Sequence, residues 1–423
     1  MTWKLDLRVD LGLSNIAADV AARQQQTAAE LCRRLNDQPG LVLADEVGMG
    51  KTFVALAVAA SAALAEHEAP VVVMVPTGVA EKWVKEWAVF TERCLAPGTP
   101  TLRVTETPVR NGTDFLRLLD DPPDRRRHLI VVTHGALSAR LGDPWVQLAL
   151  VRQALLHQRG TEPYRQALAR WGAKLFRYPN FTHAVVTDLL AAQPKHWRRI
   201  AAKYGLDPGD DPVPQPIVDA LNRIELEALR EAIWEIPFRQ SAGLDRRLKA
   251  TRKAIVDALK DAWPEVLRRV NVRLPLLILD EAHHVKNDNQ LARLFANPDA
   301  EADAEALAGA LGGMFDRMLF LTATPFQLGH GELLRVLERF EGVRWEAPLD
   351  RGRFRGQLAH LRAALGTTQA AALRLERAWG RLEVSDDLGP PPDEVEAPDR
   401  VRSARAAVDQ LREAMEAAEN LLR

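Results

Sequence analysis

The stretch that most constrains this chain is Leu41–Ala60, which reads LVLADEVGMGKTFVALAVAA. A short apolar run leads into a turn with two glycines, which is followed by Lys51-Thr52 and by an apolar helical segment. Gly48 and Gly50 can adopt backbone angles that a side chain would forbid, so successive N–H groups can turn inward around phosphate oxygens. The stretch therefore predicts a strand, a phosphate-binding loop and a helix, in that order.

The residues at the end of this loop have the chemistry that a nucleoside triphosphate needs. Lys51 would reach the β- and γ-phosphates, the Thr52 hydroxyl would hold Mg²⁺, and Met49 would contribute its backbone to the loop. The helix that begins near Lys51 adds its positive dipole end to the same anion site. Asp45 stands at the first loop position, where Gly or Ala is commoner, and a plain strand-to-helix turn is the alternative for this stretch taken alone.

Composition sets the limits within which this loop must work. A chain of 423 residues with 47% apolar residues has room for two domains, or for one large domain with insertions. Its 56 basic and 57 acidic residues are balanced, so a nucleic-acid surface must be local. Cys32 and Cys94 cannot form a disulfide framework or a zinc site, which favours a reducing compartment.

No segment has the pattern of a membrane span or a signal peptide. The N-terminus, MTWKLDLRVD, has no apolar core region. The longest apolar run, Thr52–Ala65, is too short to cross a bilayer and is interpreted as a buried helix. We therefore expect a cytoplasmic protein without a membrane partner.

Apolar runs of strand type recur along the chain and predict a parallel sheet. Such runs, alternating with helical segments, are typical of sheets covered by helices on both faces. They are Val71–Val75, Leu102–Thr105, Leu129–Thr133, Leu276–Leu279 and Met318–Leu321. Ligands of such folds bind beyond the carboxyl ends of the strands. The polar residues of interest fall at those ends: Asp45, Pro76-Thr77, Thr133-His134, Asp280-Glu281 and Thr322–Thr324.

Residues 15–36 are predicted to form a helix ahead of the phosphate loop. Ile16, Val20, Leu31 and Leu35 would form its apolar face. This helix carries three consecutive glutamines, Gln24–Gln26. One of these amides can read the adenine edge, and a solvated polar patch is the alternative.

Residues 139–272 form a long interruption of helical type between two predicted strands. It contains 22 Lys/Arg against 15 Asp/Glu, and it carries five tryptophans, at positions 145, 171, 197, 234 and 263. A basic, aromatic-bearing insertion can grip a phosphate backbone. A helical subdomain whose tryptophans form its own core is the alternative, which we favour for most of them.

The C-terminal part is predicted to be helical after Gln327. In the last segment Val401, Val408, Met415 and Leu422 are spaced by sevens, with Ala404, Leu411 and Ala418 between them. This spacing predicts an amphipathic helix that needs a partner, most simply the preceding long helix in an antiparallel pair.

The word LLILDEAHHVKN, at Leu276–Asn287, supplies the carboxylates that a phosphate loop requires. Asp280, at a strand end, can hold Mg²⁺ through water, and Glu281 can orient and deprotonate the water that attacks the γ-phosphate. His284 and Lys286 have no metal-ligand partners at useful spacing, which argues against zinc.

Taken together, five sequence motifs, in this order, resemble those of the superfamily-2 helicases and translocases, specifically the Swi/Snf-type group with its bacterial RapA-like branch. They are DEVGMGKT (Asp45–Thr52), VVVMVPTGVAEKWVKEW (Val71–Trp87), VVTHGAL (Val131–Leu137), DEAHHVKN (Asp280–Asn287) and LFLTATPFQ (Leu319–Gln327). The resemblance implies an α/β, RecA-like first motor lobe that binds ATP and Mg²⁺ and tracks along duplex DNA. The Asp45 that is unusual for a generic phosphate loop is typical of this group.

The resemblance also implies roles by motif position. Lys51 would bind the phosphates and Thr52 the metal ion. Asp280 would also hold the metal ion, and Glu281 would act on the attacking water. Thr322 and Thr324 would couple ATP hydrolysis to DNA binding, and Gln327 is the last residue of the same motif. Thr77 and Thr133 would lie near the DNA backbone, with Lys82 and Lys85 as helpers. Gln26 is the best match by spacing for the adenine-reading glutamine, with Gln25 close behind.

The implied domain organisation has four parts. Residues 1–38 form an N-terminal helical segment, 39–138 with 273–345 the RecA-like lobe, 139–272 the basic helical insertion, and 346–423 a helical protrusion. The second RecA-like lobe of the family, which supplies arginines across the nucleotide cleft, is not found after Gln327. We expect either a fragment or a second lobe on another chain. Because a missing arginine finger costs roughly 10³–10⁵ in rate, we expect nucleotide binding with little or no hydrolysis.

Two rival functions stay open at this stage. One is a non-hydrolysing P-loop module that senses nucleotide or assembles protein partners through the insertion and the tail. The intact pair Asp280-Glu281 argues against it, and the missing lobe argues for it. The other is an RNA-unwinding enzyme, which fits the words Pro76–Trp87 and Asp280–Asn287 less well.

Overall fold

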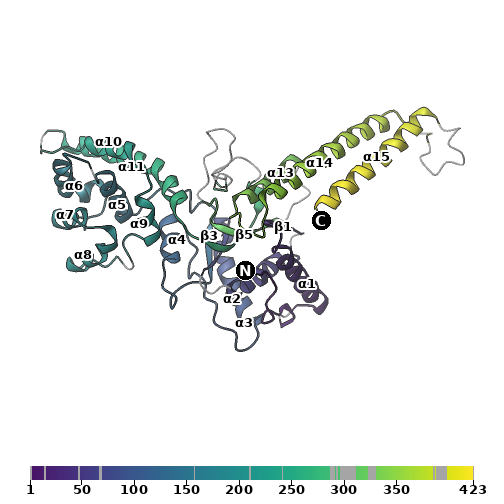
Figure 1. Ribbon diagram of the computed structural model, residues 1–423, viewed down its shortest axis with the longest axis horizontal. Helices are drawn as coiled ribbons and strands as arrows, with labels where there is room; N and C mark the ends of the chain where they lie inside the picture. The colour runs from purple at the N-terminus through teal and green to yellow at the C-terminus, as the bar shows by residue number, and fades with distance from the viewer. Residues whose placement is uncertain are drawn as a thin grey trace. The chain divides into compact units, whose positions relative to one another are not determined.

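The structure of the chain is a computed structural model (Figure 1). It describes residues 2–13, 16–45, 48–65, 69–156, 158–208, 211–240, 242–285, 291, 294–295, 311–322, 330–383, 386 and 398–422. The chain divides into two compact units, the first comprising Met1–Pro325 and Arg339–Arg344, the second Phe326–Glu338 and Trp345–Arg423. The sheet and the residues predicted to bind ATP belong to the first unit.

A five-stranded parallel sheet forms the centre of the first unit. Its strands stand in the order β1-β5-β4-β2-β3. Their bounds are β1 Gly40–Ala44, β2 Val71–Val75, β3 Leu129–Thr133, β4 Leu274–Leu279 and β5 Phe315–Thr322. All neighbouring pairs are parallel, so all five carboxyl ends meet at one edge of the sheet. This arrangement confirms the predicted α/β, RecA-like lobe.

One face of the sheet is covered by three helices from the N-terminal third of the chain (Figure 1). These helices are α1 Ala18–Arg34, α2 Lys51–Ala65 and α3 Ala80–Arg93. Alternate strand residues point toward them, since successive side chains of a strand face opposite sides. The residues that form this core with the helices are Val71, Val73, Val75, Leu129, Val131, Leu276, Ile278, Leu319 and Leu321. Helix α2 is buried from Val54 to Leu64, which confirms the interpretation of its apolar run as a buried helix.

Two local predictions are wrong. Leu102–Thr105 is not a strand: it makes only an isolated parallel bridge, Val104 to Leu129, at the β3 edge of the sheet. Pro100 and Pro108 bracket this segment, and proline cannot donate to a strand ladder. Ile16 lies before α1 and is exposed, so it does not share the apolar face of that helix.

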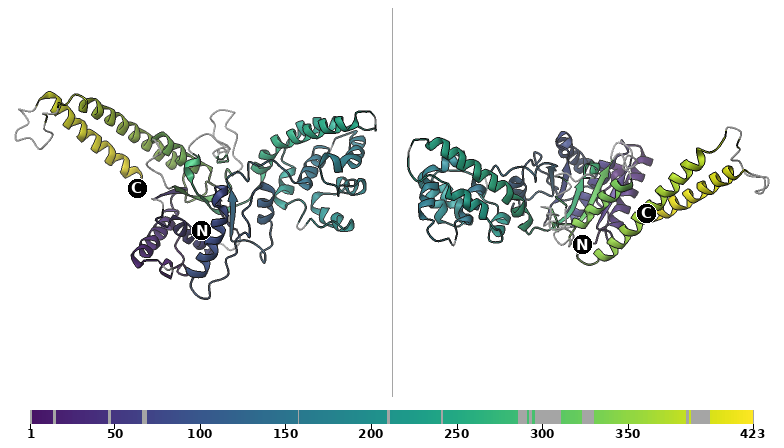
Figure 2. Two further views of the ribbon diagram at one scale, coloured as in Figure 1. Left: turned by 180° about the vertical axis from the view of Figure 1, so that it is seen from behind. Right: turned by 90° about the horizontal axis from the view of Figure 1, so that it is seen from above.

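Between β3 and β4 the regular secondary structure of the described insertion residues is helical. Its helices are α5 Pro144–Ala154, α6 Glu162–Leu175, α7 His183–Ala191, α8 Trp197–Lys203, α9 Gln215–Leu221, α10 Glu227–Trp234 and α11 Leu244–Arg269. They gather in one cluster in all views (Figure 2). Helix α4, Gly112–Leu119, precedes them and packs near β3. Short 3-10 turns cover Leu11–Leu13, Thr77–Val79, Pro194–His196, Ala282–Val285 and Arg339–Gly342.

The tryptophans of the insertion mainly build its own core. Trp145, Trp197 and Trp263 are buried, and the Trp145 ring packs edge-on against Phe181 with centroids 5.1 Å apart. Trp171 is half-buried and donates its indole N–H to the Pro237 carbonyl at 2.8 Å. Trp234 is exposed. This burial supports the core interpretation for most of them, whereas contact between the basic face and DNA stays a prediction.

The second unit is built around a helical hairpin. Its helices are α13 His330–Glu338, α14 Arg351–Trp379 and α15 Asp399–Leu422. Thr368 on α14 bonds the Ala414 carbonyl on α15, and Arg374, further along α14, bonds the earlier Gln410. The two helices therefore run antiparallel, as predicted.

The apolar face of α15 differs from the predicted one. Val408, Met415 and Leu422 are exposed, and of the residues spaced by sevens only Val401 is buried. The contact with α14 includes Ala404 and Ala418 of the predicted face and adds Ala407 and Ala414, all of which are buried. Alanines allow two helix backbones to approach closely, so the alanine stripe, and not the stripe of larger residues, faces α14.

Candidate functional site

The phosphate loop connects β1 to α2. Gly48 and Gly50 have φ values of 88° and 86°, in the left-handed region that glycine adopts without strain. Lys51 opens α2 and donates from Nζ to the Asp45 carbonyl at 2.6 Å, which bridges the two ends of the loop. No acidic residue lies in the first turn of α2, so its positive dipole end is not neutralised there. Residues 46 and 47 lie outside the described part of the chain.

Gln24 of α1 packs against this loop. Its Nε2 donates to the Met49 carbonyl at 3.2 Å, and a Cβ added to Gly50 would lie 2.0 Å from the same Nε2. The side chain is buried, yet its Oε1 has no hydrogen-bond partner among the described residues. Gly50 is favoured here by its positive φ, and a side chain at this position would also displace the end of Gln24.

The other two glutamines face elsewhere. Gln25 ties down the N-terminal segment, since it donates to the Val9 carbonyl at 2.9 Å and accepts from the Leu11 N–H at 3.0 Å. Gln26 is exposed. The role of Gln26 in adenine reading stays a prediction, while Gln24 is the glutamine that contacts the loop.

Asp280 is held at the end of β4 by several hydrogen bonds. Its backbone N–H donates to the Met74 carbonyl of β2 at 2.9 Å, which continues the sheet pairing by one residue. Its carboxylate accepts from the Glu281 N–H at Oδ1 and from the Trp83 indole N–H at Oδ2, both at 2.9 Å. A carboxylate has about four lone-pair sites, so positions remain for metal-bound water.

The electrostatics of Asp280 link it to the phosphate loop. Burial, the largest cause, raises the pKa of its carboxyl above the ordinary value, and the negative charge of Glu281 acts in the same direction. The Trp83 hydrogen bond and the positive charge of Lys51 lower the pKa. Lys51 follows β1 and Asp280 follows β4, so both lie at the carboxyl edge of the same parallel sheet.

Glu281 has an unusual backbone. Its φ of 54° lies in the left-handed region, which costs a residue with a side chain roughly 1–3 kcal/mol and is often found at functional sites. Its Oε2 lies 3.1 Å from Nδ1 of His283. The carboxylate is half-buried, in contrast to the more buried Asp280 beside it.

His134, which directly follows β3, contacts the backbone of Asp280. Its backbone N–H donates to the Val75 carbonyl, and its Nε2 lies 3.1 Å from the Asp280 carbonyl oxygen. Because a carbonyl only accepts, this contact assigns the ring proton to Nε2. Burial lowers the pKa of His134 to about 4, with His284, whose ring centroid is 5.8 Å away, adding to the effect.

The remaining predicted site residues differ in exposure. Thr322 is buried at the end of β5, where its carbonyl accepts from the Asp45 N–H at 3.4 Å. Thr77 and Lys82 are exposed. Thr133 is buried and donates its hydroxyl to the Val109 carbonyl at 3.3 Å, in the segment that flanks β3. Thr324 and Gln327 lie outside the described residues.

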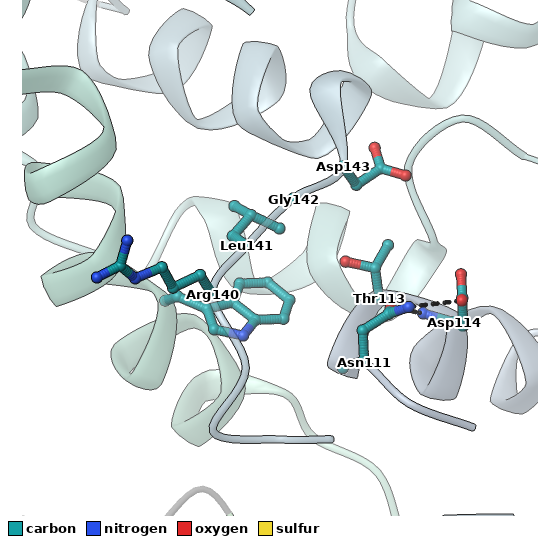
Figure 3. A pocket seen from close by; sticks show the side chains of 9 residues that line it. Asn111, Thr113, Asp114, Arg140, Leu141, Gly142 and Asp143 are labelled. Atoms are coloured by element: carbon teal, nitrogen blue, oxygen red, sulfur yellow. Dashed lines mark hydrogen bonds between the residues drawn. The ribbon is translucent and has the colours of Figure 1, made fainter. Parts of the chain in front are cut away.

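A pocket of about 200 Å³ lies away from this site, at the N-termini of α4 and α5 (Figure 3). Its carboxylates already have partners. Asp114 accepts from the Asn111 amide at 2.6 Å, and Asp143 caps α5 and pairs with Arg117 at 2.5 Å. None of the residues predicted to bind ATP lines this pocket, and we assign it no ligand.

Three residues of the site were not foreseen from the sequence in their observed roles. In the sequence, Trp83 stands out only as part of the motif Val71–Trp87 and His134 only as a strand-end residue, and Gln24 ranks behind its two neighbours. A buried tryptophan still needs a partner for its indole N–H, and this requirement was the signal for Trp83. The position of Asp280 as that partner follows only from the packing of α3 against the sheet.

The described residues contain no group of three or more His, Cys, Asp or Glu side chains that could hold a metal. Both cysteines are free, and burial raises the pKa of Cys32 to about 12 and that of Cys94 to about 11. Among the described helices, none has the length and apolarity needed to cross a membrane.

The five-stranded parallel sheet, with a glycine loop between β1 and α2, is the architecture of a RecA-like lobe. Residues 23–113, which include the phosphate loop, α3 and Trp83, match the SNF2-related domain family. This match supports a Swi/Snf-type ATPase lobe of the superfamily-2 helicases and translocases, a helicase-like motor domain. No curated protein matches the chain. Its assignment to the RapA-like branch stays a prediction.

Proposed function

We propose that this chain is the first motor lobe of an ATP-dependent duplex-DNA translocase, and that a second RecA-like lobe, in cis or in trans, completes its hydrolytic site. The observation that carries the proposal is the convergence of Lys51 with Asp280 and Glu281 at one edge of a parallel sheet. A cation, a helix N-terminus and two carboxylates are the groups that a triphosphate with Mg²⁺ requires.

The residues present fit ATP and Mg²⁺. The backbone opposite Gly48 is open, because no atom lies within 4 Å of an added Cβ there. Lys51 would exchange the Asp45 carbonyl for phosphate oxygens, while Thr52 and Asp280 would hold the metal. Bound Mg²⁺ would neutralise phosphate charge, and Glu281 would orient and deprotonate the attacking water. The unpartnered Oε1 of Gln24 makes this residue a second candidate, beside Gln26, for contact with the nucleotide base.

The surface that binds nucleic acid would include Thr77 and Lys82, which both follow β2 at its carboxyl end. Thr77 lies in the 3-10 turn before α3, and Lys82 lies in the first turn of α3. Both are exposed, and the Lys82 ammonium lies 3.4 Å from Glu86, in an ion pair that water and salt can readily break. The basic insertion would extend this face. Two buried thiols suit a reducing cytoplasm.

Two lysine variants of the full chain test the proposal. Lys51→Ala removes a charge-assisted hydrogen bond to phosphate and should lower the affinity for ATP with Mg²⁺ by roughly 10- to 100-fold, with duplex-DNA binding unchanged. Lys82→Ala should weaken DNA binding and leave the affinity for ATP unchanged. The slope of the log DNA-binding constant against log salt concentration should decrease in magnitude by about 1.

Fluorescent-nucleotide binding and DNA anisotropy measure the two effects. Equal nucleotide affinity in Lys51→Ala and the unaltered chain would show that the loop does not hold phosphate. The same titrations with RNA duplexes separate a DNA translocase from an RNA-unwinding enzyme.

A further inference from the structure

Helix α3 carries two tryptophans one helical turn apart, and both are buried. Trp83 is 2% exposed and Trp87 is 1% exposed. Each donates its indole N–H, but to different acceptors. Trp87 bonds the Leu102 carbonyl at 3.1 Å, whereas Trp83 bonds the Oδ2 atom of Asp280 at 2.9 Å. Trp83 therefore bonds the Asp280 carboxylate, and Trp87 is a matched neighbour that does not.

The Trp83 contact fixes the carboxylate in a way that nothing else in the described structure does. The Glu281 N–H holds Oδ1, but a single hydrogen bond restrains the rotation of the carboxylate about its Cβ–Cγ bond less than two would. A second donor on Oδ2 defines its plane. The Asp280 backbone is already held by the Met74 carbonyl and by His134, so the side chain is the remaining degree of freedom.

We propose that Trp83 is a positioning residue for the metal site: its indole N–H orients the Asp280 carboxylate so that the free lone pairs point toward Mg²⁺. The inference rests on the proposed function, because it assigns Asp280 to the metal. Donors that hold a metal-site carboxylate in place typically contribute 10- to 100-fold in metal affinity. Trp83 would contact neither the nucleotide nor the metal.

The test compares Trp83→Phe with Trp87→Phe in the full chain. Phenylalanine keeps an aromatic ring and removes the N–H donor in both. Binding of a fluorescent ATP analogue is measured against Mg²⁺ concentration, and binding of ADP is measured without Mg²⁺. Thermal melting of each variant reports any loss of folding.

In Trp83→Phe we expect the Mg²⁺ concentration for half-maximal ATP binding to rise about tenfold, with metal-free ADP binding unchanged. Trp87→Phe should leave both values as in the unaltered chain. A merely structural role would move the two variants alike, and an unchanged Mg²⁺ midpoint in Trp83→Phe would overturn the proposal. If the unaltered chain shows no Mg²⁺-dependent nucleotide binding, the proposed function itself fails.

If Trp83→Phe does not fold, the indole N–H spectrum of the unaltered chain decides. The chain has ten tryptophans. Mg²⁺ added with nucleotide should shift the indole signal that Asp280→Asn also shifts. If Mg²⁺ leaves that signal in place, Trp83 does not sense the metal site and the inference is wrong.

Discussion

At the scale of single residues, His134 should make folding stability depend on pH. Its folded-state pKa is about 4, below the 6.5 of an unfolded chain, so the unfolded state binds more protons between these values. Stability is therefore fully present above pH 6.5 and is lost as pH falls toward 4, by roughly 3 kcal/mol in total. Urea unfolding in EDTA across this range measures the effect.

A matched variant isolates the histidine from other titrating groups. His134→Gln keeps an amide donor for the Asp280 carbonyl but does not titrate, so its stability should fall less steeply between pH 6.5 and 4. Identical pH profiles for both proteins would mean that His134 is already protonated in the fold, or that its ring is not buried in solution.

The sequence was most informative where function depends on adjacent residues. The places of Lys51, Asp280 and Glu281 in the fold could be predicted because a glycine turn and a strand end are local patterns, while their roles stay a proposal. The bond from Trp83 to Asp280 joins positions 197 apart, and it depends on how α3 packs on the sheet. The contact between Gln24 and Met49 likewise depends on the rotation of α1, which helical spacing alone does not determine.

At the scale of elements, the α14–α15 hairpin should be sensitive to the size of its alanines. Ala404 is completely buried and packs with Ala378 and Ala407, so Ala404→Leu forces the two helices apart and should destabilise the hairpin by about 1–3 kcal/mol. Val408→Leu, on the exposed side of the same helix, should change stability little. Hydrogen exchange of α15 amides measures both, and equal protection in the two variants would contradict the observed packing.

A helix or strand could be predicted from the sequence where its burial produces a clear pattern of apolar residues. Strands β2, β3 and β4 are buried throughout and α2 is buried from Val54 to Leu64, so each is a nearly continuous apolar run. The Leu102–Thr105 segment alternates apolar and polar residues between two prolines, and it makes only one bridge to β3. In α15 the spacing by sevens correctly placed Ala404 and Ala418 in the contact, but Val408, Met415 and Leu422 of the same pattern are exposed.

At the scale of the whole molecule, the proposed function divides the work between two lobes. The lobe described here would contribute the phosphate loop, the carboxylates and a basic insertion. The charges that stabilise the transferring phosphoryl group would come from the other side of the nucleotide, and an arginine in that position contributes roughly 10³–10⁵ to the rate. Binding and turnover should therefore separate in this chain.

The most direct measurement is ATP turnover by this chain, with and without duplex DNA, beside Glu281→Gln as the control for contaminating activity. The account predicts that ATP and Mg²⁺ bind, while turnover stays at the Glu281→Gln level with or without DNA. Turnover that rises with DNA and disappears in Glu281→Gln would contradict it, because the site would then be complete without a second lobe.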